Sequence, residues 1–255
     1  MTVLVGILAS DGVAVAADRQ VTVGHVGLPT QKIAPVGGDS LVASSGSLAL
    51  GQKIRMVFET HHAELRAHPY ADHLPAIEQA IRVVVTPTLQ MAEKTRYVIP
   101  GAENNALACS LACVPFADGL RLCHIDYDGS IYCLNENLPY VTAGSGKINA
   151  DPFIRFIWDV FWPESGHLPP LREAIFAAYW TVQMNIEYQS MGVGIGVDVW
   201  TVSRNGNGGY AAAETDRARL EPSGMFIESM KHAMRAQRDL TFGNGEIPAD
   251  APPKL

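Results

Sequence analysis

The predicted strands and helices of this chain come in blocks, and this order constrains the fold more than any other feature. Alternating apolar residues between Asp-Gly turns indicate strands, whereas apolar residues three and four positions apart indicate helices. Each of three strand blocks is followed by helices. Strands are expected at 2–10, 13–22, 32–36, 40–45, 106–114, 120–126, 131–134, 140–143, 193–202 and 209–213, and helices at 47–67, 72–96, 150–161, 170–188 and 223–238.

This order favours an α+β fold over a parallel doubly wound sheet, because strictly alternating strand–helix–strand units are absent. Two stacked antiparallel sheets with a helix pair on each outer face satisfy the pattern. The sequence therefore predicts a four-layer αββα sandwich in a single domain over residues 2–240, with a flexible C-terminal tail at 241–255. Residues 23–31 are expected to form a loop, and Pro87 is expected to kink or break the second helix.

Composition and charge argue against two classes of partner. The chain has 255 residues and a formal net charge of −7, so it has no basic excess with which to neutralise nucleic-acid phosphates. No segment approaches the roughly 18 apolar residues of a membrane-spanning helix. The apolar segment Val3–Ala9 is too short for a signal peptide and no basic residue precedes it. We therefore expect a cytoplasmic protein that binds neither nucleic acid nor membranes.

Cysteines and histidines give little sign of a metal centre. Without a signal peptide, free buried thiols are expected rather than disulfides at Cys109, Cys113, Cys123 and Cys133. The first two of these cysteines lack the histidine partners of a zinc site. Solvated side chains are expected for the histidines on or between the first two helices, which are His61, His62, His68 and His73. No metal and no cofactor is predicted.

Thr2 is the first candidate for chemistry. Aminopeptidases remove an initiator methionine when the next side chain is small, so Thr2 is expected to become the amino terminus. Such a residue offers a hydroxyl nucleophile and, in its own α-amino group, a base with a pKa of about 7.7–8.0. Threonine is also common at this position, so the residue by itself does not indicate catalysis.

Asp18 and Lys32 lie at the ends of predicted strands. A carboxylate there is either an exposed edge residue or a buried, paired charge. A buried lysine beside a hydroxyl would stabilise the alkoxide, and Asp18 would hold that lysine charged. A three-residue loop Ser10-Asp11-Gly12 would place Asp18 opposite Leu4, with Thr2 and Asp18 on one face about 7 Å apart. A two-residue loop would put the two side chains on opposite faces and require a bulge.

Two glycine-containing junctions lead from strands into helices. Gly46 follows a strand and precedes a helix, where its backbone N–H and the positive end of the helix dipole can stabilise an oxyanion. An ordinary helix cap by Ser45 or Ser47 also explains this segment. Gly144-Ser145-Gly146 has the same position before a later helix and fits a tight turn, a phosphate site or a cap.

Taken together, these elements resemble the proteasome-type N-terminal nucleophile hydrolases. The family has a nucleophilic threonine, an Asp-Gly hairpin that ends in aspartate, a lysine, a glycine before the first helix and a Gly-Ser-Gly before the third helix. Here the matching segments are Thr2–Ile7, Asp11–Arg19, Lys32-Ile33, Ser45–Ser47 and Gly144–Gly146. The resemblance extends from Thr2 to about Arg238 and favours a bacterial proteasome β-subunit homologue, related to the HslV peptidase.

The resemblance implies a role for each matching residue. Thr2 would be the nucleophile, Lys32 would lower the pKa of its hydroxyl, and Asp18 would orient Lys32. The Gly46 N–H would form the oxyanion hole, and Ser145 would hydrogen-bond the amino terminus. The family also has an aspartate followed three residues later by a serine and then a glycine. The segment Glu187–Met191 has Glu187 and Ser190 at these two positions, but carries glutamate for the aspartate and Met191 for the glycine.

The function implied by the resemblance is a threonine-type endopeptidase that degrades peptides or unfolded proteins through an acyl-enzyme. The family relation implies a homo-oligomeric double ring with the sites inside, favoured as a 14-mer over a 12-mer, and an ATPase unfoldase ring is a candidate partner. The alternatives are another amide chemistry at the same site, an amidase or a transpeptidase, and a non-catalytic ring subunit. Alignment gives a neutral substrate pocket formed by Val21, Thr30, Ala34, Ser44 and Leu48.

Overall fold

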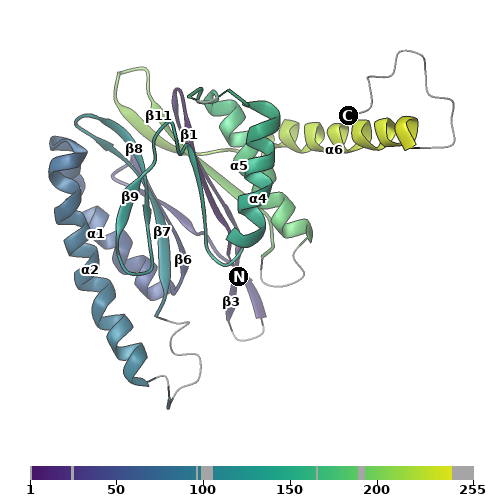
Figure 1. Ribbon diagram of the computed structural model, residues 1–255. Coiled ribbons are helices and arrows are strands. Elements are labelled where there is room, and N and C mark those ends of the chain that lie inside the picture. The colour runs from purple at the N-terminus through teal and green to yellow at the C-terminus, as the bar shows by residue number, and fades with distance from the viewer. Residues whose placement is uncertain are drawn as a thin grey trace. The chain divides into compact units, whose positions relative to one another are not determined.

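The computed structural model describes residues 2–23, 26–95, 97–98, 106–164, 166–188 and 193–242 (Figure 1). The chain divides into two compact units, Met1–Thr215 and Asp216–Leu255. Within the described residues, the first unit contains both five-stranded sheets and the helices α1, α2, α4 and α5, and the second contains α6 (Arg217–Phe242). That residues 2–240 form a single domain stays a prediction, and most of the predicted tail, residues 243–255, lies outside the described residues.

The first unit is built on two antiparallel sheets. One sheet has the order β10-β1-β2-β11-β12, and its strands are β1 (Leu4–Ala9), β2 (Gly12–Asp18), β10 (Tyr140–Ala143), β11 (Val197–Arg204) and β12 (Tyr210–Glu214). The other has the order β5-β6-β7-β8-β9, with β5 (Ile33–Val36), β6 (Ser40–Gly46), β7 (Ala108–Phe116), β8 (Gly119–Ile125) and β9 (Ile131–Cys133). Strands β1 and β2 are therefore central in the first sheet, and β6 and β7 in the second.

Apolar side chains from both sheets form the core between them. Leu4 and Val15 from the first sheet are buried in one cluster with Leu41, Leu111 and Leu122 from the second. Successive side chains of a strand point to opposite faces, so a strand covered on both faces is apolar throughout. Strand β7 shows this pattern, since all nine of its residues are buried.

Helices cover both outer faces, which confirms the predicted αββα sandwich (Figure 1). Helices α1 (Leu48–Ala67) and α2 (Tyr70–Thr95) lie over the β5–β9 sheet, whereas α4 (Lys147–Phe161) and α5 (Leu171–Tyr188) lie over the other. The apolar stripes predicted from helical spacing face the sheets. Ile54 and Phe58 of α1 and Ile81 of α2 pack with Val114 of β7 in a second buried cluster.

The helix boundaries follow local sequence signals, with one exception. Ser47 is the N-cap of α1, and its hydroxyl accepts a hydrogen bond from the Leu50 N–H at 3.4 Å. Of the kink or break expected at Pro87, the structure excludes the break, because α2 runs unbroken from Tyr70 to Thr95. The buried residues Ile81 and Val85 anchor the helix on the sheet, and this packing outweighs the backbone hydrogen bond that proline removes.

The N-terminal hairpin has the shorter of the two loops that the sequence allows. Ala9 pairs with Gly12 and Leu4 with Ala17, so the loop has two residues and not three, and Asp18 does not lie opposite Leu4. The second strand also ends at Asp18. After it, β3 (Gln20–Val23) pairs with β4 (Val26–Pro29) in a separate hairpin, so the predicted strand 13–22 is divided between β2 and β3, and β4 lies where a loop was predicted.

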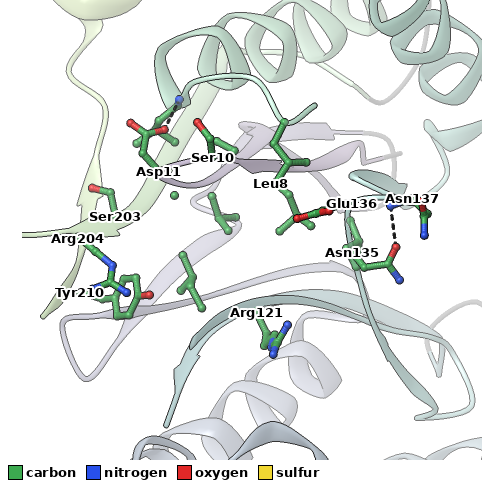
Figure 2. Close-up of a pocket in the computed structure, with 17 residues that line it drawn as sticks. Leu8, Ser10, Asp11, Arg121, Asn135, Glu136, Asn137, Ser203, Arg204 and Tyr210 are labelled. Carbon is green, nitrogen blue, oxygen red and sulfur yellow. Dashed lines mark hydrogen bonds between the residues drawn. The ribbon is translucent and has the colours of Figure 1, made fainter. Parts of the chain in front are cut away.

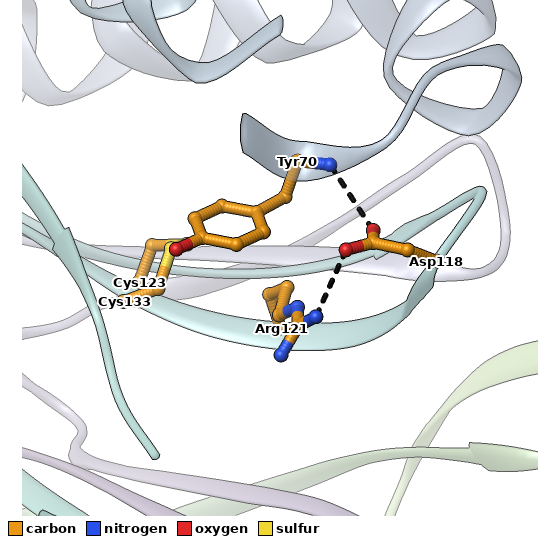
Figure 3. Close-up of a disulfide and its surroundings, with 5 residues drawn as sticks. All are labelled: Tyr70, Asp118, Arg121, Cys123 and Cys133. Atoms are coloured by element: carbon orange, nitrogen blue, oxygen red, sulfur yellow. Dashed lines mark hydrogen bonds and ion pairs between the residues drawn. A yellow bond between two sulfur atoms is a disulfide. The ribbon is translucent and has the colours of Figure 1, made fainter. Parts of the chain in front are cut away.

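Two of the four cysteines form a disulfide, contrary to the expectation of free thiols (Figure 3). Cys123 of β8 and Cys133 of β9 are directly opposite each other in the sheet register, which brings their side chains together. Beside them, Arg121 donates a hydrogen bond to Asp118 at 2.9 Å and lies over the Tyr70 ring. The remaining cysteines, Cys109 and Cys113, are free and buried, as predicted for them.

No helix among the described residues is long and apolar enough to cross a membrane.

Candidate active site

Thr2 lies just before the start of β1, where one segment distant in sequence holds its backbone. The Thr2 N–H donates to the Ser145 hydroxyl at 3.0 Å, and the Thr2 carbonyl accepts from the Gly146 N–H at 2.9 Å. Ser145 and Gly146 follow strand β10, which pairs with β1. The Gly-Ser-Gly segment singled out in the sequence therefore fixes the backbone of the candidate nucleophile, and Thr2 itself is half-buried.

A buried ion pair lies next to Thr2. Lys32 donates to Oδ1 of Asp18 at 2.7 Å, and the side chains are only 5% and 0% exposed, respectively. The same oxygen accepts the Val3 N–H at 2.9 Å, while Oδ2 accepts the Gln20 N–H at 3.3 Å. The Asp18 carboxylate thus links the lysine to the residue that follows Thr2. The two-residue hairpin loop puts the side chains of Thr2 and Asp18 on opposite strand faces. Asp18 nevertheless stays at the site, because its carboxylate accepts the Val3 N–H.

The surroundings of Lys32 shift its acid–base behaviour. Burial lowers the pKa of the Lys32 ammonium from its ordinary value of 10.5, and the opposing attraction of Asp18 only partly offsets that effect. The lysine backbone is fixed as well, because its carbonyl accepts the Ser44 N–H at 3.1 Å. The Lys32 ammonium is thus fixed in position by Asp18 and loses its proton more easily than the side chain of a lysine in water.

Gly46 occupies a backbone conformation and a space that suit only glycine. Its φ is +96°, and a Cβ atom there would lie 2.2 Å from the Leu107 carbonyl oxygen. The residue is exposed, and α1 begins two positions later with Ser47 as its cap. The positive end of the helix dipole therefore lies beside an accessible backbone segment, as an oxyanion site requires.

Glycine is also required at positions 144 and 146, because the turn they belong to approaches Thr2 closely. Gly144 has a φ of +85°, and a Cβ atom there would lie 2.5 Å from the Thr2 carbonyl oxygen and 2.6 Å from Oγ of Ser45. A Cβ atom on Gly146 would lie 2.9 Å from the Val3 Cβ atom. The two glycines thus let the turn approach the start of β1 closely enough to form its hydrogen bonds.

The last two predicted site residues are Glu187 and Ser190, and the structure describes only the first of them. Glu187 lies on an exposed face of α5, where it accepts a hydrogen bond from Gln183 at 3.1 Å, and Ser190 lies outside the described residues. Asn185, half a turn earlier, is fully buried and faces Gly146, since a Cβ on that glycine would lie 3.4 Å from its Oδ1. Its Nδ2 donates to the Thr181 carbonyl, whereas Oδ1 has no hydrogen-bond partner within the described part of the chain.

Sequence reasoning missed Asn185 because the family motif directed attention to a carboxylate. One signal was available: Thr181 and Asn185 are polar residues four apart on the helix face that also carries Ala177 and Ala178. Small residues on such a face indicate close packing, so polar groups among them are candidates for buried, specific contacts.

Four of the five residues of the predicted substrate pocket are on different elements, and Thr30 directly follows β4. Ser44 is on β6 beside Lys32, and Thr30 donates its backbone N–H to the Arg19 carbonyl at 2.9 Å. None of the five is buried, and Leu48, the first residue of α1, is 55% exposed. Val21 is on β3 and Ala34 on β5. Uncharged and accessible side chains are therefore available on the strands beside the ion pair.

A cavity of about 820 Å³ lies at the other end of the sandwich (Figure 2). Its lining includes Leu8 and Asp11 from the β1–β2 hairpin, Asn135 after β9, and Arg204 and Tyr210 from β11 and β12. Thr2, Asp18 and Lys32 are not among its lining residues. This cavity is thus separate from the candidate nucleophile.

Free cysteines near the site do not compete with Thr2 as nucleophiles. Cys109 lies on β7, directly opposite Ser45 of β6. Burial raises the pKa of the Cys109 thiol and raises the pKa of the Cys113 thiol further. The thiolate is the reactive form of cysteine, so these side chains stay protonated and inert.

Comparisons with known proteins agree with this geometry. A family model described as "Proteasome subunit" matches residues 2–159, more than half of the chain. No curated protein matches. Two solved structures have the same fold: Anbu (ancestral beta-subunit) from Yersinia bercovieri and the helical assembly of the Anbu complex from Pseudomonas aeruginosa. Each is 16% identical to this chain, with a TM-score of 0.65. The match to the Yersinia structure covers 91% of this chain, the match to the Pseudomonas structure covers 92%, and both cover 96% of the solved chain. The resemblance inferred from motifs is confirmed, and the chain belongs to the proteasome subunit family.

Proposed function

We propose that this chain is a threonine-type endopeptidase whose nucleophile is the hydroxyl of Thr2. The proposal includes removal of Met1, so that the Thr2 amino group becomes free. That amino group takes the hydroxyl proton as Oγ1 attacks the carbonyl carbon of a peptide bond, and later donates a proton to the leaving amine. The acyl group remains as an ester on Thr2 until water, activated by the same amino group, hydrolyses it.

The observation that carries this proposal is the buried Asp18–Lys32 pair one residue from Thr2. Burying an ion pair seldom stabilises a fold more than apolar side chains of similar volume would, because both ions lose their hydration. A structural role alone therefore explains this pair poorly. An ammonium next to the nucleophile stabilises the alkoxide form of the hydroxyl, and Asp18 keeps the ammonium charged and oriented.

One backbone segment and two side chains support the remaining steps. The exposed backbone at Gly46, at the N-terminal end of α1, is our proposed oxyanion site for the tetrahedral intermediate. Ser145, already bonded to the Thr2 nitrogen, is proposed to orient the free amino group. We assign the corresponding support from α5 to Asn185, whose buried amide oxygen has no other partner among the described residues, in place of Glu187.

Peptide hydrolysis and amide chemistry that passes the acyl group to an amine share this acyl-enzyme. Fluorogenic peptides incubated with and without an added amine separate them, because a transpeptidase makes an amide product whereas a peptidase yields the free acid. The Thr2→Ala variant is the control. Equal and negligible turnover by both proteins would favour a non-catalytic subunit and contradict the proposal.

Specificity follows from the neutral residues beside the ion pair. A pocket formed by Val21, Thr30, Ala34, Ser44 and Leu48 gains about 25 cal/mol for each Å² of apolar surface that it buries. A charged side chain would lose hydration there without a partner. We expect cleavage after Leu, Phe or Tyr and little after Asp, Glu, Lys or Arg. A peptide panel that varies only this position tests it, and faster cleavage after a charged residue would mean that other residues form the pocket.

We also propose that the chain self-assembles in the cytoplasm, with its sites enclosed so that an unspecific nucleophile does not meet other proteins. Exposed apolar side chains on the outer helices, such as Ile148, Phe156 and Val160 of α4, are consistent with subunit contacts. A double ring of 14 or 12 subunits stays our prediction, with an ATPase ring as a candidate partner. The Pseudomonas neighbour is described as a helical assembly, so electron microscopy of purified particles is needed to distinguish closed rings from a helix.

A further inference from the structure

Two histidines and a glutamate meet where α1 ends and α2 begins. His61 and Glu64 are three residues apart on α1 and so share a helix face. His73 is in the first turn of α2, after the connection at His68-Pro69. Because the connection is short, the chain reverses direction and brings the start of α2 next to the last turns of α1. The sequence alone had predicted solvated histidines here.

All three side chains direct a metal-binding atom at one point. Nδ1 of His61 lies 2.9 Å from Oε2 of Glu64, and Nε2 of His73 lies 3.5 Å from the same oxygen. The three atoms all lie within 4.8 Å of one another. Ligands about 2.0–2.1 Å from a tetrahedral ion lie about 3.3 Å apart. The two distances to Oε2 of Glu64 lie on either side of this value. Small rotations about side-chain bonds would bring Nδ1 of His61 and Nε2 of His73 to the same separation from each other.

The hydrogen bonding of the cluster is incomplete. Nε2 of His73 is buried and has no hydrogen-bond partner in the part of the chain that the structure describes. Its 3.5 Å separation from Glu64 is an ion-pair distance, too long for a good hydrogen bond. His68 stacks on the His73 ring, with centroids 5.6 Å apart and planes 15° apart, which restrains the ring orientation. A buried nitrogen lone pair or N–H without a partner is costly, and a bound cation would satisfy the lone pair.

We propose that His61, Glu64 and His73 bind a divalent transition metal, with Zn²⁺ as the best match. Two imidazole nitrogens and one carboxylate oxygen form a three-ligand protein set of the kind that zinc binds, with water in the fourth position. A hard cation such as Ca²⁺ would require more oxygen ligands than the cluster offers. This site is independent of the proposed peptidase activity. It would join α1 to α2 at the end of α1 opposite Gly46.

Titration of the full-length protein with ZnCl₂ in an isothermal calorimeter tests the proposal. We expect saturable binding of one Zn²⁺ per chain. Replacing a ligand should weaken affinity by about 100-fold or more, since loss of even a residue that only orients a ligand costs about 10–100-fold. Glu64→Gln and His73→Asn are the informative variants, and His167→Asn, which changes an exposed histidine elsewhere, is the control.

A Co²⁺ titration followed by visible absorption gives a second readout, because tetrahedral cobalt with nitrogen ligands absorbs strongly. The wild type and His167→Asn should develop the bands, whereas Glu64→Gln and His73→Asn should not. Circular dichroism without metal checks that each variant folds; Glu64 is 60% exposed, so its substitution should not disturb the fold. Absence of one-to-one binding by the wild type, or equal binding by folded Glu64→Gln, would overturn the proposal.

Discussion

The two ends of strands β1 and β2 differ in how their polar groups are used. At one end, the Gly-Ser-Gly turn holds the Thr2 backbone, and the nearby Asp18–Lys32 pair is almost fully buried. At the other end, the β1–β2 turn borders the 820 Å³ cavity. The buried end carries the candidate nucleophile and the ion pair, whereas the cavity end carries only the Asp11-Gly12 turn of the family motifs. Cavity volume is therefore a poorer guide to chemistry in this fold than a buried ion pair.

Polar groups at the cavity end already have structural partners (Figure 2). Asp11 accepts the Leu171 N–H at 2.7 Å, which ties the hairpin turn to the start of α5. Asn135 accepts the Asn137 N–H at 2.9 Å, and Arg204 lies over the Tyr210 ring. These contacts stabilise loops. None of them arranges a nucleophile beside a base, so the comparison predicts different sensitivities to mutation at the two ends.

Removal of the nucleophile or its ammonium should have the largest effect. Thr2→Ala deletes the attacking oxygen and should lower kcat by at least about a thousandfold. Lys32→Ala alone would leave Asp18 buried without its partner, at a cost of about 3–5 kcal/mol in the free energy of unfolding. The double variant Lys32→Ala/Asp18→Asn removes both charges and is the cleaner test. Peptide turnover measured beside particle size should show lost activity with intact assembly; unchanged turnover would show that the lysine has no role.

Gly46→Ala should have the next largest effect. The new Cβ would clash with the Leu107 carbonyl oxygen, displace the proposed oxyanion site and lower kcat by about 100-fold. Gly38→Ala is a matched control, because Gly38 also has a positive φ, +82°, but its Cβ would meet nothing within 4 Å. Both variants share the backbone strain of about 1–3 kcal/mol. Equal kcat values for the two variants would contradict the assigned role of Gly46.

A smaller effect is expected from pH. Burial lowers the pKa of Lys32, so the ammonium should be lost, and kcat should fall, at a pH below 10.5. Between the folded-state pKa and 10.5, the unfolded chain binds more protons than the folded one, so this group's contribution to the free energy of unfolding rises with pH. The acidic limb should reflect the free amino group, with a pKa of about 7.7–8.0. A kcat profile that stays flat up to pH 10.5 would argue against a catalytic ammonium.

The smallest effect is expected at the cavity end. Arg204→Ala removes a contact with the Tyr210 ring that lies 5.4 Å from the guanidinium carbon, and exposed contacts of this type contribute about 0.5–1 kcal/mol. Peptide turnover should change by less than about twofold, while the melting temperature falls slightly. A large loss of turnover without loss of assembly would mean that the cavity contributes to substrate binding and would break the comparison.

Periodic and capping patterns predicted much of the fold. Strand β10 begins and ends at the predicted residues, Tyr140 and Ala143, and α1 begins directly after Ser47. These elements have strong local signals. The hairpin register stayed open because Asp11-Gly12 fits both two- and three-residue loops, and only the pairing with neighbouring strands selects between them.

Features that depend on tertiary contacts were not predictable to the same degree. The Cys123–Cys133 disulfide depends on the β8–β9 register, which spacing alone does not fix. At the site, the motif brought attention to Thr2, Asp18 and Lys32, and the structure places Asp18 and Lys32 in direct contact. The position of Asn185 behind Gly146 requires knowledge of how α5 packs on the sheet, so it could not be inferred from the sequence.

The most direct test of the central claim is intact-mass and N-terminal peptide mass spectrometry after reaction with a peptide β-lactone, an electrophile that acylates nucleophilic hydroxyls. We predict that the purified protein lacks Met1 and gains one acyl group per chain, located on Thr2. Lys32→Ala/Asp18→Asn should react far more slowly. Retention of Met1 in active protein, or an acyl group on a residue other than Thr2, would contradict the account.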